Sequence, residues 1–263
     1  MWPIIKWTLW QRRWVMLWWC IGIISLIVLT LALYPIIRDQ ASQLNKSFSG
    51  LPSSTLALFG GTDFFSPIGY LNSQLIYLTL PLILTILGLG LGSSLIGKEE
   101  ADGTIETILS RPISRTKLLA SKAIAGTLNI FIVTFIALII TILLADLVNM
   151  GIPLGNISLA FMESFLLILT FSSVAFLLSA SGRGRVAALG ISVAYAMGGY
   201  IVGSLATTVH WLKGPSLIFA YHYYRSAEIL EGNFRWSSII FYTALIISCF
   251  ILSLVVFRSR DLE

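Results

Sequence analysis

The chain has 263 residues, of which 57% are hydrophobic and only 11% are charged, whereas soluble domains carry about 25% charged residues. Its apolar residues fall into blocks of about twenty with few charges, the length that a helix needs to cross a membrane. This distribution excludes a soluble enzyme of ordinary composition and predicts an integral membrane protein. The net charge of +5 would suit a nucleic-acid partner, so the positions of the basic residues decide its meaning.

The predicted fold is all-α, a single polytopic membrane domain over residues 1–263 with six transmembrane helices. Lipid offers the backbone no hydrogen-bond partners, so an apolar block that crosses it must be helical. The first block is too long for a cleaved signal peptide, and no small-residue cleavage site follows it. The six predicted spans cover residues 15–37, 75–96, 124–144, 157–180, 186–206 and 239–257.

The residues before the first span are aromatic and amphipathic. Trp7, Trp10, Trp14 and Trp18 follow spacings of three and four, so one face of a helix is lined with indole, and basic residues lie between them. We expect residues 1–14 to form an interfacial helix in the headgroup layer before the chain turns into the first span. The alternative is an aromatic belt that anchors that span.

Two long segments face the same side of the membrane in this topology, 38–74 after the first span and 207–238 before the last. The first is mildly apolar and is interrupted by proline and glycine, so we expect short surface helices there. The second is too polar to cross the bilayer and too aromatic for a free loop. We therefore expect a helical piece that is partly sunk in the outer leaflet and that could be re-entrant.

The segment between the second and third spans carries the densest charge. It holds four carboxylates within eight residues and an apolar edge made by Ile105, Ile108 and Leu109; the carboxylates are Glu99, Glu100, Asp102 and Glu106. Because Pro112 disfavours helix at the residue before it, a short helix should end near Arg111. This predicts an amphipathic helix that could dock into a groove on a soluble partner. A solvated loop is the alternative, and the residues alone do not choose between them.

A second helix is predicted directly after this segment. Ser114 can cap it with its hydroxyl, and the helix would then carry Arg115, Lys117 and Lys122 into the third span.

The fourth and fifth spans contain two further candidates. Glu163 is the one acidic residue clearly within a span, and it could line a translocation path or simply reach the headgroups. Small residues recur along the fifth span with the spacing that lets two helix backbones approach closely. This stripe could pack within the chain or form a dimer seam; it consists of Gly190, Ala194, Gly198, Gly199 and Gly203.

The basic residues are distributed unevenly between the two sides of the predicted membrane. Twelve of the 17 lie in the terminal segments, in the 97–123 connection and in the 181–185 turn, which are the segments on one side. The positive-inside rule then places both termini in the cytoplasm of a multi-pass cell-membrane protein. The basic excess is therefore topological, and no nucleic-acid partner is expected.

The charged connection resembles the cytoplasmic signature of type-2 ABC exporter permeases. Ile105 stands where leucine is usual. The matching residues are Glu100, Gly103, Thr104, Glu106, Ile108, Leu109, Ser110, Pro112, Ser114, Arg115, Leu118, Leu119 and Lys122.

This resemblance implies export by two such permeases, identical or homologous, coupled to two cytoplasmic ATP-binding subunits that carry ATP and Mg²⁺. In that family the loop after the second span forms the main coupling helix, and the first and fifth spans commonly meet across the dimer. We expect Arg183 and Arg185 to add a smaller second contact to the ATPase. The expected main coupling residues are Glu99, Glu100, Asp102, Gly103, Thr104, Glu106, Leu109, Ser110, Arg111, Pro112, Ser114 and Arg115.

Enzymatic readings find little support in the sequence. Residues 92–99 imitate a phosphate-binding loop, but Glu99 replaces the hydroxyl that should hold Mg²⁺, so ATP binding by this chain is not expected. Cys20 and Cys249 lie in predicted spans and suggest neither a disulfide nor a metal site. We expect no catalytic residue, metal or cofactor on this chain. The alternative function is an ion-coupled carrier or a channel without an ATPase, which usually needs buried ionisable groups.

Overall fold

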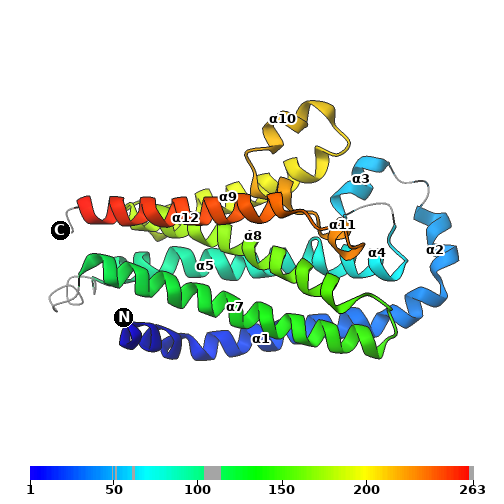
Figure 1. Ribbon diagram of the computed structural model, residues 1–263, viewed down its shortest axis with the longest axis horizontal. Coiled ribbons are helices and arrows are strands. Elements are labelled where there is room, and N and C mark those ends of the chain that lie inside the picture. Colours follow the sequence, from blue (N-terminus) through cyan, green and yellow to red (C-terminus); the bar gives the residue numbers. More distant parts are fainter. Residues whose placement is uncertain (49, 51, 61–62, 104–113, 261–263) are drawn as a thin grey trace.

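The computed structural model describes residues 1–48, 50, 52–60, 63–103 and 114–260, and within these ranges it contains helices and no strand. Among them, six helices are long and apolar enough to cross a membrane, which confirms the predicted all-helical, six-span fold. The start of α1 and the end of α12 lie at the same end of the bundle (Figure 1). The six are α1 Trp2–Asp39, the run Pro67–Ala101, α7 Arg115–Leu147, α8 Leu154–Ala180, α9 Gly184–Leu205 and α12 Trp236–Ser259.

We call the end of the bundle that holds the start of α1 and the end of α12 the terminal end, and the opposite one the loop end. At the loop end, the connections carry several short helices. These are α2 Ala41–Phe48, α3 Ser53–Leu58, η2 His210–Leu212, α10 Lys213–Ser216, η3 Ala220–Tyr223 and α11 Ser226–Leu230. The helical character expected for 38–74 and 207–238 is therefore present, and α10 stands out from the side of the bundle (Figure 1).

Helix α1 corrects the prediction of a separate interfacial helix over residues 1–14. It runs unbroken from Trp2 to Asp39, so the expected turn into the first span is wrong. The reason is local, because neither glycine nor proline interrupts the chain between Pro3 and Gly22. The indole face is present all the same, and its four tryptophans are exposed.

The second span is interrupted near the loop end. It is built from α4 Pro67–Leu71, the π-helical turn η1 Asn72–Ile76 and α5 Thr79–Ala101, with a break at residues 77–78. The hydroxyl of Ser66 caps the start of α4 by accepting the Gly69 N–H at 3.0 Å. A π-helical turn leaves backbone carbonyls without their usual α-helical partners. These carbonyls can therefore accept hydrogen bonds from side chains at the loop end.

Helices α5 and α8 are the most deeply buried of the long helices, and they pack extensively against each other. Glycine makes this approach possible, since a Cβ on Gly88 would lie 2.9 Å from Ile168 Cγ2, and one on Gly92 would meet the backbone of Ser172. Helix α1 packs on α7, while α9 and α12 lie against α8. Because α5 and α8 interlock along their backbones, they should move as one unit.

Candidate functional site

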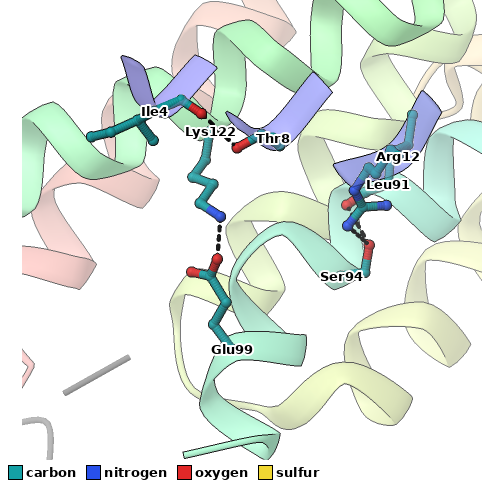
Figure 2. A network of polar contacts seen from close by, with 7 residues as sticks. All are labelled: Ile4, Thr8, Arg12, Leu91, Ser94, Glu99 and Lys122. Atoms are coloured by element: carbon teal, nitrogen blue, oxygen red, sulfur yellow. Dashed lines mark hydrogen bonds and ion pairs between the residues drawn. The ribbon is translucent and has the colours of Figure 1, made fainter. Parts of the chain in front are cut away.

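A buried ion pair joins α5 to α7 at the terminal end. The Lys122 ammonium of α7 contacts the Glu99 carboxylate of α5, and the two side chains are only 7% and 20% exposed. Figure 2 shows the two side chains pointing toward each other beneath the first turns of α1. An ammonium this deeply buried needs a charged partner. Glu99 therefore has a structural role as the partner of Lys122.

Helix α1 is joined to α5 nearby. Arg12 donates from Nη2 to the Ser94 hydroxyl at 2.7 Å, and Ser94 in turn donates to the Leu91 carbonyl at 3.3 Å (Figure 2). The two polar contacts, Lys122–Glu99 and Arg12–Ser94, therefore connect α1, α5 and α7 close to where α5 ends.

Arg260 forms the centre of a second set of contacts at the terminal end. Its Nη1 donates to Glu100 Oε1 at 2.7 Å, and its carbonyl accepts from Arg115. The guanidinium also lies on Gly182, where a Cβ would come 2.5 Å from Arg260 Cζ; the glycine has φ +82°, which suits no other residue well. Arg260, at the end of α12, thereby contacts the end of α5, the start of α7 and the 181–185 turn.

The predicted coupling residues are brought to this end in part. Thr104, Glu106, Leu109, Ser110, Arg111 and Pro112 lie outside the described residues, as does the predicted coupling helix itself. Asp102 and Gly103 end α5 in exposed positions. The predicted cap is confirmed, because the Ser114 hydroxyl accepts the Lys117 N–H at 3.3 Å and α7 begins at Arg115.

The 181–185 turn lies against the same end of α5. Arg183 precedes the first residue of α9 and is exposed, and a Cβ on Gly97 would lie 3.2 Å from the Cβ of Arg185. The 181–185 turn and the described residues at the end of α5, which the sequence suggested as two contacts to a partner, are therefore neighbours in space.

The small-residue stripe on α9 divides into two parts. Toward the loop end it packs within the chain, since a Cβ on Gly199 would lie 3.3 Å from Phe219, and one on Gly203 3.3 Å from the His222 nitrogen. Gly198 lies at the edge of this contact. Gly190 and Ala194 are exposed, so these two residues remain available to a partner helix.

Of the two alternatives for Glu163, the structure contradicts the one in which its carboxylate reaches the headgroups. Its side chain is only 1% exposed, and Oε2 accepts the backbone N–H of Arg225 at 3.2 Å. The headgroup reading is wrong because this position of α8 faces the bundle interior, where the segment carrying Arg225 covers it. The carboxylate anchors the chain at the loop end.

Tyrosine hydroxyls complete the loop end. Tyr224 donates to the Ile76 carbonyl at 2.6 Å and lies 2.7 Å from the Ser164 hydroxyl, while Tyr221 donates to the Tyr77 carbonyl. These are carbonyls at the break between η1 and α5. Burial raises the pKa of Tyr221 and Tyr224 far above the ordinary value, so both hydroxyls remain protonated donors.

Sequence reasoning missed Arg260 and these tyrosines. No group of three or more His, Cys, Asp or Glu residues within the described part of the chain could hold a metal ion.

The family of this chain follows from comparison with known proteins. A family model described as "ABC-2 family transporter protein" matches residues 11–262, nearly the whole chain. A search of curated proteins gives no match. Membership implies a transport subunit in a membrane, together with ATP-binding partner subunits. With its six apolar helices, the chain therefore belongs to the ABC-2 family of transporter proteins, as a multi-pass membrane permease.

Proposed function

We propose that this permease is the membrane-spanning half of an ATP-driven exporter. It works with a second permease, identical or homologous, and with cytoplasmic subunits that bind ATP and Mg²⁺. The terminal end faces the cytoplasm of the cell membrane, which the excess of basic residues in its segments supports. The exporter-like signature between residues 99 and 122 supports the direction of transport.

The observation that carries this proposal is the convergence of helix ends on Arg260. The segment 104–113 leaves the described chain after Gly103 and returns at Ser114, between Glu100 and Arg115, the two residues bound by Arg260. A partner that pushes on this segment therefore acts on α5, α7 and α12 together. A solvated loop with no role in coupling would not need such ties.

The movement can be followed through the bundle. When nucleotide binding closes the ATPase subunits, their displacement of the coupling segment shifts the end of α5. Helix α8 must follow, because Gly88 and Gly92 bring its backbone into direct contact with α5. The start of α9 follows through the contact of Arg185 with Gly97. Opening of a path between two protomers is the proposed result.

Copurification tests the proposal most directly. The tagged full chain, extracted from its native membranes in mild detergent, should bring down an ATP-binding protein in stoichiometric amount, and the complex should hydrolyse ATP. A chain that purifies with no ATPase would overturn the proposal in favour of a carrier or channel.

Charge reversal then tests the coupling region. We expect Glu100→Lys and Glu106→Lys to uncouple ATP hydrolysis from transport in reconstituted vesicles, while the spans stay folded. Glu231→Lys, an exposed reversal at the loop end, is the matched control and should leave coupling unchanged. The double variant Glu100→Lys/Arg260→Glu restores the ion pair in reverse and should recover coupling. Unchanged coupling in Glu106→Lys would argue against this segment as the contact.

A further inference from the structure

A cavity of about 790 Å³ lies at the loop end, between the end of α9, the α10 segment and the segment of η3 and α11. This volume is within the range of small-molecule sites. Its lining combines basic and hydroxyl side chains with apolar ones, including Lys213, Arg225, Thr207, His222, Tyr221 and Leu217. It therefore offers both charge and apolar surface to one ligand.

The charge of this cavity is positive. Glu228 also lines it, but its carboxylate is held between Arg225 at 2.8 Å and Arg235 at 3.2 Å, so two guanidinium groups neutralise one acid. Within the part of the chain that the structure describes, Lys213 makes no ion pair. Burial and the neighbouring Arg225 lower the pKa of His222, which is therefore neutral near pH 7. The cavity suits an anion.

A separate apolar groove of about 280 Å³ lies next to this cavity, along the membrane-spanning helices. It lies between α5 and α9 and is lined by Leu82, Ile86, Val193 and Met197 among others. Tyr221 lines both spaces, so the groove and the basic cavity are neighbours. A ligand that fills both must carry an anionic group at one end and a hydrocarbon chain at the other.

The surface beside the cavity supports the same conclusion. On the α10 segment, which stands out from the bundle (Figure 1), Trp211 and Ile218 are 74% and 72% exposed. Tryptophan beside a lysine with apolar neighbours is typical of a segment that lies at the membrane–water boundary. The cavity is thus at the depth where lipid headgroups lie.

We propose that the cavity and the groove together bind one lipid with an anionic phosphate headgroup. The phosphate lies on Lys213 and Arg225 with the hydroxyl of Thr207 beside them, and an acyl chain occupies the groove between α5 and α9. The two basic groups favour an anionic headgroup over a zwitterionic one, since they repel the cation that a zwitterionic headgroup carries. The groove favours a ligand with an acyl chain. This binding is independent of the proposed coupling to an ATPase.

Native mass spectrometry of the purified full chain can measure this binding. The probes are dioctanoyl phosphatidylglycerol, dioctanoyl phosphatidylcholine and inorganic phosphate, each titrated separately. We expect saturable binding of the phosphatidylglycerol, and binding at least about tenfold weaker for inorganic phosphate, which has no chain to bury. Equal affinity for the two lipids, or for the lipid and inorganic phosphate, would overturn the proposal.

Two variants with matched controls locate the site. Lys213→Gln should weaken phosphatidylglycerol binding about tenfold, because it removes a charge-assisted contact. Arg38→Gln removes a basic residue outside the cavity and should change affinity less than about twofold. Val193→Trp fills the groove and should weaken the lipid but not inorganic phosphate, whereas Ile191→Trp, exposed on the same helix but outside the groove, should not.

The same spectra report the oligomeric state. They therefore show whether the groove holds a lipid or a second copy of this chain. If Val193→Trp leaves lipid affinity unchanged and converts a dimer into monomers, the groove belongs to a second copy and the proposal fails. It fails equally if Lys213→Gln binds phosphatidylglycerol as the unaltered chain does. Lys213 is exposed, so its replacement leaves the fold intact.

Discussion

At the terminal end the helices are joined by long charged side chains, Lys122 with Glu99 and Arg260 with Glu100, whereas at the loop end the break between η1 and α5 is held by neutral tyrosine hydroxyls that donate to backbone carbonyls. The attraction between charges falls off slowly with distance, while a hydrogen bond weakens steeply when its angle or length changes. The terminal end can therefore stay tied while its helix ends shift. The hydroxyl contacts at the break tolerate little change in geometry.

This difference suggests a division of labour in the permease. A partner that pushes at the terminal end meets contacts that adapt, and the resulting movement turns about a loop end that does not. The segment from η3 to α11 is fixed to the bundle at several independent points. In addition to the tyrosines, Ser226 donates to Asn72 Oδ1 at 2.7 Å and Asn156 donates to the Leu230 carbonyl at 2.9 Å.

The largest change in stability is expected from breaking the buried ion pair. Glu99→Gln leaves the Lys122 ammonium buried beside a neutral amide, and the free energy of unfolding should fall by about 3 kcal/mol. Unfolding by SDS titration in mixed micelles, followed by circular dichroism, measures this. Glu99→Gln/Lys122→Met removes both charges and should recover most of the loss. A single variant as stable as the unaltered chain would show that the pair is not buried from water.

A smaller effect is expected at the loop end. Tyr224→Phe removes the hydroxyl that serves the Ile76 carbonyl and Ser164, and the tyrosine is only 4% exposed. Leaving a buried carbonyl without a donor costs about 1–3 kcal/mol. The neighbouring Tyr223→Phe removes a longer, exposed contact of 3.4 Å to Leu217 and is the control, with little change. Equal effects of the two variants in the same titration would contradict a rigid loop end.

The sequence predicted local features of the fold better than the contacts that join the helices at the two ends. The spans and the Ser114 cap depend on residues close in the chain, and the sequence predicted both. The pair Glu100–Arg260 joins residues 160 positions apart, and Tyr224 meets Ile76 across 148. No local pattern marks such partners, because packing of the whole bundle selects them. The two alternatives for Glu163 stayed open for the same reason, since hydropathy does not say which face of α8 is covered.

The smallest expected effect is a pH dependence of stability that arises at the loop end. His222 lines the loop-end cavity, donates to or accepts from Ser216 at 2.9 Å, and has its pKa lowered by burial and by Arg225. The unfolded chain therefore binds a proton on this residue more readily than the folded chain. The contribution of His222 to stability should fall as pH drops below about 6.5, the ordinary pKa of histidine, and level off once the folded state is protonated too.

His222→Gln should remove this part of the pH dependence and keep a polar group beside Ser216. His210→Gln, at an exposed histidine of the same connection, is the matched control and should keep the slope. If the slope survives in His222→Gln and disappears in His210→Gln, the pH response arises outside the cavity. Unfolding titrations at pH 7 and pH 5.5 decide whether the pH response arises at His222. The same titrations show whether the loop end is less stable under acidic conditions.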